Sequence, residues 1–303
     1  MINETESTES KIYRNSPSKM AEGMAMHRYN ESLKSKEERL CYDPYAIHFI
    51  NPKIIEYGKN NPEKAKYKIE EMEKIFPGLS SSILARVRYF DDFVGAQIGK
   101  GLEQLVILGA GYDTRAYRIE KLKKNIKVFE VDHPNTQSFK IQKINEIFGT
   151  IPDYVTYIPV DLETQELSKN LMINGYQPNK KTLFIMEGLI MYIPQKSIEK
   201  IFSFISKNSG TGSSIIFDYY PESVVNGSNK LEIAKNIRKF VIQQGEPLKF
   251  GIEDGRTEEF LANNGFKQIK NIRSEDYKKA YFHGKNQNRM VCDLLSFVQA
   301  IVE

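Results

Sequence analysis

Short apolar runs alternate with longer, more polar segments through the last two thirds of this 303-residue chain. This alternation is typical of β-α-β units, in which buried strands form a parallel sheet between two layers of helices. Seven apolar runs predict strands: Gln104–Leu108, Ile126–Val131, Tyr154–Val160, Thr182–Met186, Ser214–Phe217, Phe266–Ile272 and Leu294–Val302. The segments between the first five predict four helices: Thr114–Leu122, Asn135–Phe148, Thr164–Ile173 and Gln195–Lys207. The sequence therefore predicts an α/β fold.

The remaining segments predict additions to this sheet. Residues 1–19 are mostly Ser, Thr, Asn, Glu and Lys, so we expect a mobile tail with little apolar surface to bury. Residues 20–100 show helical patterning interrupted by prolines and predict an N-terminal helical cap. Residues 101–303 form the sheet domain, and within it residues 221–253 interrupt the alternation. We expect this interruption to be an insertion that covers a ligand.

Composition excludes several classes of protein. A formal charge of +4 is too small for a chain of 303 residues to predict a nucleic-acid partner. No apolar run approaches the length of a membrane span, and the polar N-terminus lacks the pattern of a secretion signal. Cys41 and Cys292 lie far apart, and the four histidines lack metal-ligand spacing. We therefore expect a cytoplasmic protein with no membrane partner, no disulfide framework and no metal site.

The segment after the first predicted strand carries the most informative motif. Gly109-Ala110-Gly111 joins this strand to a helix, and glycines there allow a sharp turn close to a ligand at the helix N-terminus. A dinucleotide site has a third glycine where this chain has Thr114, which argues against a bound diphosphate. Asp113 in the same turn fits a ligand with a cationic amine and no phosphate. The alternative for Asp113 is a cap on the following helix.

Acidic residues follow the next three strands. Glu130 and Asp132 end the second strand about 20 positions after the first glycine, where a ribose-binding carboxylate belongs in this kind of sheet. Asp161 follows the third strand and is placed to accept a hydrogen bond from an adenine amino group. Glu187 follows the fourth strand and projects over the cleft. Together with the glycine turn, these acids predict a pocket the size of a ribonucleoside.

Several longer strings resemble a known family. They are YDPYA, LARVRYFDDFV, LVILGAGYDTRAYR, VFEVDHPNTQSFK, VDLE and FIMEGLIMYI, in that order. They resemble the leucine carboxyl methyltransferase family, which includes O-methyltransferases of polyketide synthesis. The resemblance implies a Rossmann-like class I methyltransferase sheet of seven mostly parallel strands, the last of them antiparallel. It also implies an N-terminal helical cap, a helical insertion after the fifth strand and S-adenosyl-L-methionine as the cofactor.

The resemblance also assigns roles to single residues. In the family, the arginine of the ARV segment holds the methionine carboxylate of the cofactor, and this residue is Arg86 here. Gly109 and Gly111 match the glycine turn. Asp132 matches the acid that binds the ribose.

Other residues match family positions at the adenine end and the methionine end of the cofactor. Asp161 and Leu162 match an acidic-leucine pair near the adenine, and Glu187 matches an acid near the methionine end. Some family members also contact the cofactor through an N-terminal basic residue. The candidates for that contact are Arg28, Lys34 and Lys36.

The expected reaction is methyl transfer to oxygen. A carboxylate acceptor is ionised at neutral pH and needs no general base, whereas a hydroxyl acceptor would need one, with His133 or Tyr220 as candidates. The predicted function is therefore O-methylation of a carboxylate, either of a small acid or of a peptide C-terminus. The alternatives are a non-catalytic S-adenosylmethionine-binding protein and a nicotinamide-dependent oxidoreductase.

Overall fold

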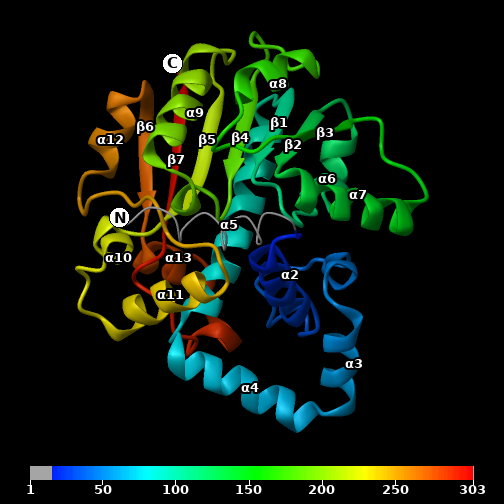
Figure 1. Cartoon of the computed structure of the whole chain (residues 1–303), viewed down its shortest axis with the longest axis vertical. Helices are drawn as coiled ribbons and strands as arrows, with labels where there is room; N and C mark the ends of the chain where they lie inside the picture. Colours follow the sequence, from blue (N-terminus) through cyan, green and yellow to red (C-terminus); the bar gives the residue numbers. More distant parts are fainter. Residues whose placement is uncertain (1–15, 303) are drawn as a thin grey trace, which may run out of the picture.

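The computed structural model describes residues 16–302, and its strands form one seven-stranded sheet in the order β3-β2-β1-β4-β5-β7-β6 (Figure 1). The strands are β1 Gln104–Leu108, β2 Lys127–Asp132, β3 Val155–Pro159, β4 Thr182–Met186, β5 Ser214–Tyr219, β6 Phe266–Ile272 and β7 Ser296–Val302. β7 is antiparallel to both of its neighbours, and the other pairs are parallel. This arrangement confirms the predicted sheet. The strand order reverses between β1 and β4, and ligands bind at such a point in open α/β sheets.

Helices cover both faces of the sheet because successive strand residues point in opposite directions. Leu105 and Ile107 of β1 belong to one buried cluster, while Val106 and Leu108 belong to the other. The first cluster lies under α5 Leu79–Gly99, α6 Arg115–Arg118, α7 Pro134–Phe148 and α13 Ser274–Tyr281. The second lies under α8 Leu167–Ile173, α9 Gln195–Lys207 and α12 Thr257–Asn263.

Two of the predicted helices differ from those observed. The predicted helix Thr114–Leu122 is broken at Ile119, whose backbone is extended, into α6 and the 3₁₀ helix η2 Glu120–Lys123. This break turns the chain so that Leu122 is buried. The predicted helix Thr164–Ile173 begins only at Leu167, because the N–H groups of residues 164 and 165 both donate to the carbonyl oxygen of Asp161 and form a turn.

The segment predicted as a cap contains α2 Lys19–Ser32, the 3₁₀ helix η1 Ala46–Phe49, α3 Pro52–Asn60, α4 Pro62–Ile75 and α5. Pro52 and Pro62 begin α3 and α4, at the helix position where proline is favoured. Gly78, with φ of 71°, precedes α5. α5 packs against the sheet, whereas α3 and α4 extend away from it (Figure 1). Residues 1–15 of the predicted tail lie outside the described residues, and α2 begins at Lys19, within the range predicted as tail.

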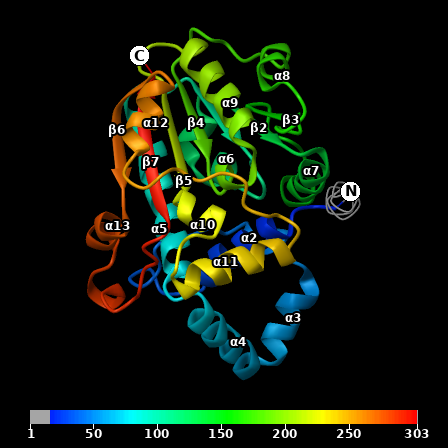
Figure 2. The same cartoon turned by 60° about the vertical axis from the view of Figure 1, so that its left-hand side comes forward.

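The interruption at residues 221–253 leaves the sheet and returns to the same place. Pro221 and Ile252 form an isolated parallel bridge, and between them lie α10 Glu222–Asn226 and α11 Glu232–Gln243. α11 lies beyond the end of the sheet, on the same side as α2 (Figure 2). Within residues 16–302, none of the helices has the length and apolar character needed to cross a membrane.

Candidate active site

A cavity of about 1430 Å³ opens at the carboxyl ends of β1, β2 and β4, below α2 and α11. It is lined by every residue predicted to contact the cofactor, namely Arg86, Gly109, Gly111, Asp113, Asp132, Asp161, Leu162 and Glu187. They converge because parallel strands end at the same edge of the sheet. Pockets for small ligands usually have volumes of about 300–1,000 Å³, so this one has room for a cofactor and a second molecule.

The glycine turn is closely packed by other parts of the chain. Gly109 and Gly111 have φ of 62° and 43°, in the left-handed region that favours glycine. A Cβ on Gly109 would lie 2.7 Å from Cδ1 of Leu189, and a Cβ on Gly111 would lie 3.3 Å from Cβ of Ala21 in α2. Packing within the protein therefore favours glycine at both positions, independently of any ligand.

Asp132 lies directly beside this turn. Its Oδ2 accepts a hydrogen bond from the N–H of Gly111, and its Oδ1 accepts one from the N–H of His133 at 2.6 Å. Burial raises the pKa of Asp132 above its ordinary value, against the effect of these two donors. Glu130, from the same strand, pairs with Lys140 at 2.6 Å and is fully buried under α7. Only Asp132 of these two acids lines the cavity.

The third strand end contributes a more open part of the wall. Asp161 and Leu162 are both half-buried, and Oδ1 of Asp161 accepts a hydrogen bond from the N–H of Glu163 at 2.9 Å. The N–H of Asp161 donates to Oε1 of Gln165 at 2.8 Å. The local turn thus fixes the position of Asp161 at the cavity wall.

Arg86 lies at the centre of a buried charge network. Its Nε is 3.1 Å from Oε1 of Glu187, and its Nη1 is 2.6 Å from Oδ2 of Asp218. Its Nη2 donates to the sulfur of Met24 at 3.4 Å, and a thioether is a weak acceptor. The Nη2 group of Arg86 is therefore the part of the guanidinium best placed to bind an anion.

Asp113 has a protein partner, which supports the alternative of a helix cap. Its Oδ1 accepts a hydrogen bond from the N–H of Arg115 at 2.7 Å, and its Oδ2 is 2.5 Å from Nη1 of Arg115. Although burial disfavours its charge, the Arg115 guanidinium lowers the pKa of Asp113 to about 2. Arg115 also reaches Glu187 at 2.6 Å. Asp113 still lines the cavity, but its charge is balanced by Arg115 rather than available for a cationic ligand.

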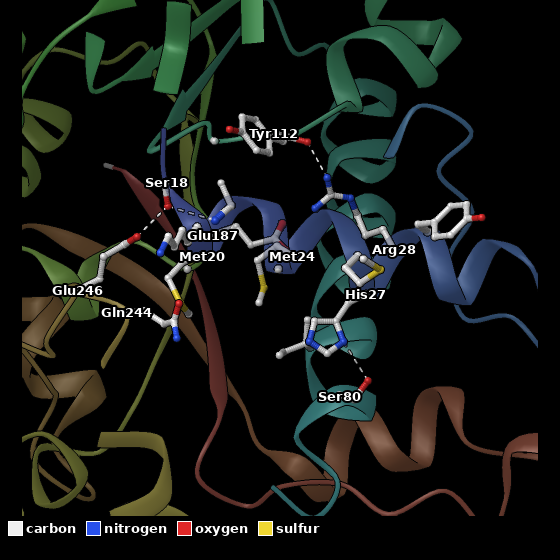
Figure 3. A pocket seen from close by; sticks show the side chains of 18 of the residues that line it. Ser18, Met20, Met24, His27, Arg28, Ser80, Tyr112, Glu187, Gln244 and Glu246 are labelled. Carbon is white, nitrogen blue, oxygen red and sulfur yellow. Dashed lines mark hydrogen bonds between the residues drawn. The ribbon is translucent and has the colours of Figure 1, made fainter. Parts of the chain in front are cut away.

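Three charged residues of this site were absent from the expected set or left undecided. Arg115 and Asp218 hold Glu187 and Arg86, and Asp218 also accepts the N–H of Gly188 at 2.5 Å. The sequence could have indicated Asp218, because it is another acid near the end of a strand. Among the N-terminal candidates, Arg28 reaches the glycine turn, where its Nη2 donates to the carbonyl oxygen of Tyr112 at 2.6 Å (Figure 3).

The other two N-terminal candidates, Lys34 and Lys36, are exposed. Lys34 pairs with Glu31 at 2.8 Å. Of the three candidates, Arg28 alone is buried beside the turn.

His27 of α2 extends the site away from the strand ends. Its Nδ1 is 3.0 Å from Oγ of Ser80, as Figure 3 shows. Burial, together with the charges of Arg86 and Arg28, lowers the pKa of His27 to about 4. Burial also raises the pKa of Tyr220, which lines the cavity. His133 begins α7, and its Nδ1 accepts a hydrogen bond from the N–H of Asn135 at 3.4 Å.

Known proteins of similar sequence include methyltransferases. YktD of Bacillus subtilis, provisionally named an S-adenosyl-L-methionine-dependent methyltransferase, is 28% identical over 255 residues, covering 84% of this chain and 82% of YktD. A protein of Mycobacterium marinum with the same provisional name is 34% identical over 145 residues, which cover 48% of this chain and 47% of that protein.

Solved structures share the fold. A DUF574 family protein of Streptomyces avermitilis has a TM-score of 0.59 and 10% identity, covering 93% of this chain and 97% of its own. A provisionally named methyltransferase of Thermobifida fusca has a TM-score of 0.55 and 12% identity, covering 77% and 86%. The profile of the leucine carboxyl methyltransferase family matches residues 21–206, which is more than half of the chain. The chain therefore belongs to the leucine carboxyl methyltransferase family.

Proposed function

We propose that this protein transfers a methyl group from S-adenosylmethionine to the oxygen of a carboxylate. Its family and relatives make it an S-adenosylmethionine-dependent methyltransferase. Our proposal adds the acceptor to this function: it is the carboxylate of a small acid or of a peptide C-terminus. We also place the enzyme in a reducing cytoplasm, which is supported by Cys41 and Cys292, both free and buried.

The residues of the cavity fit this cofactor. The turn at Gly109 and Gly111 has the left-handed backbone that favours glycine, and Asp132 beside it keeps lone pairs for ribose hydroxyls after accepting two backbone N–H groups. Nη2 of Arg86 suits the methionine carboxylate, with Met24 as the group to be displaced. Asp161 and Leu162 then line the adenine end.

One observation carries the choice of a carboxylate acceptor. His27, in the acceptor part of the cavity, has a pKa lowered to about 4, so it is a weak base at neutral pH. The Tyr220 phenol is held neutral by its raised pKa. A hydroxyl acceptor would need a base near pH 7, whereas a carboxylate is already ionised. His133, the other candidate base, lines the cavity, but its Nδ1 is occupied by the N–H of Asn135 at the start of α7.

The work of the protein is then chiefly orientation. When bound, the cofactor supplies an electrophilic methyl group. Alignment of donor and acceptor contributes roughly 7–11 kcal/mol to reactions of this kind. We propose that α2 and the insertion at residues 221–253 hold the acceptor in line and exclude water, because both close the cavity beyond the strand ends.

Calorimetric titration tests the cofactor site. We expect micromolar binding of S-adenosylhomocysteine and no binding of NAD. Asp132→Ala and Arg86→Ala are expected to lose that binding, and circular dichroism establishes whether each variant is folded. Binding of NAD instead would support an oxidoreductase and contradict the proposal.

Activity separates an enzyme from a binding protein. A panel of carboxylic acids and matched alcohols is incubated with S-adenosylmethionine labelled in the methyl group. We expect labelled methyl esters and no labelled ethers. Tight cofactor binding without transfer to any carboxylate would favour the non-catalytic alternative, and transfer to the alcohols alone would exclude a carboxylate acceptor.

A further inference from the structure

The cavity continues beyond the cofactor end along one face of α4. Ala65, Ile69 and Met72 of α4 line it at intervals of four and three residues, and Phe76, directly after the helix, continues this lining. This spacing places them in one stripe along a helix. The apolar face of α4 is therefore turned toward the cavity.

A second helix face lies on the other side. Ile237, Phe240 and Val241 of α11 also form a stripe at helical spacing and line the same cavity. The rings of Phe76 and Phe240 make an edge-on contact, with centroids 5.6 Å apart and planes at 72°. This contact joins the stripes of α4 and α11 at one end.

α2 supplies the side nearest the cofactor. Met24 and His27 line the cavity and lie one turn apart on that helix (Figure 3). We use the name apolar chamber for the space bounded by the side chains that these three helices contribute, chiefly Met24, Ile69, Met72, Phe76, Ile237 and Phe240.

The chamber exposes apolar side chains that a folded chain usually buries. Ile69 is 58% exposed and Met72 is 42% exposed, and both line the cavity. Ile54 of α3, which lines the same cavity, is 47% exposed. Isolated exposed apolar residues are common, but a contiguous group marks a binding surface. Their exposure on the cavity wall therefore favours an apolar ligand in the chamber.

The chain offers no suitable occupant of its own at its N-terminus. Ser16 and Ser18 line the cavity, and residues 1–15 precede them in the sequence. That segment is mostly Ser, Thr, Asn, Glu and other polar residues, which do not suit apolar walls.

A peptide fits less well than a hydrocarbon. Every residue of an extended peptide has N–H and C=O groups that need partners when they are buried. The stripes of α4 and α11 present apolar side chains, and the backbone groups within these helices bond to one another. Charged side chains of α4, such as Lys66 and Glu73, also line the cavity beside these stripes. At the cofactor end, His27 and Ser80 meet at 3.0 Å.

We propose that the methyl acceptor is a carboxylic acid with a long apolar body, its carboxylate beside His27 and Ser80 and its body in the apolar chamber. This inference rests on the proposed function and narrows its substrate class. A carboxylate oxygen forms a bond to the methyl carbon while the sulfur–methyl bond breaks, and that electron pair remains on the sulfur. The products are a methyl ester and S-adenosylhomocysteine, and no proton moves.

The test is calorimetric titration of the protein saturated with S-adenosylhomocysteine. The probes are dodecanoate, hexanoate and an octapeptide that ends in leucine. Because each buried methylene adds to affinity, we expect dodecanoate to bind at least about 100-fold more tightly than hexanoate, and more tightly than the peptide. The same three compounds are then offered as acceptors with labelled cofactor, and dodecanoate is expected to give the highest kcat/KM.

Matched variants locate the bound probe. Ile69→Gln combined with Met72→Gln changes two exposed residues of the chamber, and Ile75→Gln changes an apolar residue on the same helix that is 43% exposed and outside the cavity lining. Since a polar side chain weakens an apolar contact, we expect the double variant to bind dodecanoate about tenfold or more weakly. Ile75→Gln should stay within twofold, and both should bind S-adenosylhomocysteine as before.

The outcomes separate this inference from the proposed function. Equal affinity for hexanoate and dodecanoate, tighter binding of the peptide, or the same loss in Ile75→Gln as in the double variant would overturn the apolar chamber as the acceptor site while cofactor binding persists. Failure of S-adenosylhomocysteine to bind the unmodified protein would instead overturn the proposed function itself, and the inference with it.

Discussion

Two carboxylates, those of Asp218 and Glu187, hold Arg86 at the centre of the site. Its guanidinium lies between Asp218, whose side chain is fully buried, and Glu187, whose side chain is 13% exposed. Asp218 is bonded to both Nη1 of Arg86 and the N–H of Gly188, so it fixes the arginine relative to the end of β4. The orientation of Nη2 toward the cavity depends on this buried carboxylate.

Asp218→Asn is expected to loosen Arg86. The asparagine amide places N–H groups against either Arg86 or the N–H of Gly188, so the buried Arg86 loses one of its two carboxylate partners. We expect a cost of about 3–5 kcal/mol in unfolding free energy. Chemical denaturation measures this loss, and calorimetry should show about tenfold weaker binding of S-adenosylhomocysteine in the folded variant. The control is Asp92→Asn, which breaks an exposed pair with Arg88 and should change stability by less than about 1 kcal/mol. Unchanged cofactor affinity in Asp218→Asn would contradict the assigned role.

The lowered pKa of His27 predicts that the stability of the folded protein depends on pH. Its pKa is lowered from 6.5 to about 4 in the folded protein, so between these pH values the unfolded chain binds a proton that the folded chain does not. Folding is therefore stabilised above pH 6.5, and this contribution is lost as the pH falls toward 4. We expect the unfolding free energy of the unmodified protein to drop by about 1–2 kcal/mol more than that of His27→Gln between pH 7 and pH 4.5. Parallel pH profiles of the two proteins would contradict this prediction.

Among the elements, the turn after β1 shows how close packing selects glycine. It lies between the ends of β1 and β2, where the N–H of Ala110 donates to the carbonyl oxygen of Val131 at 3.1 Å. Leu189, after β4, and Ala21, in α2, approach the turn from two other sides. The backbone of the turn is therefore shaped by three elements besides its own strand.

Gly109→Ala and Gly101→Ala separate backbone strain from close packing. Both glycines have positive φ, 62° and 81°, so each alanine is expected to lower stability by about 1–2 kcal/mol. A Cβ on Gly109 meets Leu189 at 2.7 Å, whereas a Cβ on Gly101 meets nothing within 4 Å. Calorimetry should show that only Gly109→Ala loses at least tenfold in affinity for S-adenosylhomocysteine. Equal affinity in the two folded variants would show that close packing at Gly109 has no role in cofactor binding.

In the molecule as a whole, α2 is tied to both the sheet and the C-terminal segment. Arg28 of α2 donates to the carbonyl oxygen of Tyr112 in the glycine turn at 2.6 Å. Glu31 of α2, nearly fully buried, pairs with Arg289 at 2.8 Å. These contacts link the two ends of the chain around the cavity, so α2 and the sheet should unfold together.

Ligand binding should therefore stabilise the entire chain. At a concentration of 100 times its Kd, S-adenosylhomocysteine is expected to raise the unfolding free energy by about 2.7 kcal/mol, whereas NAD should have no effect. Far-UV circular dichroism and the fluorescence of the 17 tyrosines, in a chain without tryptophan, should report one shared transition. Two transitions, of which the ligand shifts only one, would show that α2 and the sheet unfold separately.

Local sequence patterns were enough to predict the strands, the glycine turn and the edge of the sheet at which Asp132, Asp161 and Glu187 meet. These features depend on local patterning and on one general property of parallel sheets, that their strands end along a common edge. The break at Ile119 was not evident, because it depends on how the following residues pack rather than on local helical pattern.

The pairing of the charges and the course of the cavity depend instead on contacts between distant parts of the chain. Arg86 and Asp218 are 132 positions apart in the chain, and their contact depends on packing between α5 and the sheet. Asp113 is paired with Arg115, a choice that the sequence left open. The apolar chamber forms because α4 and α11, which are far apart in sequence, turn their apolar stripes toward one cavity. Such contacts are set by the three-dimensional arrangement of helices, which local sequence patterns do not specify.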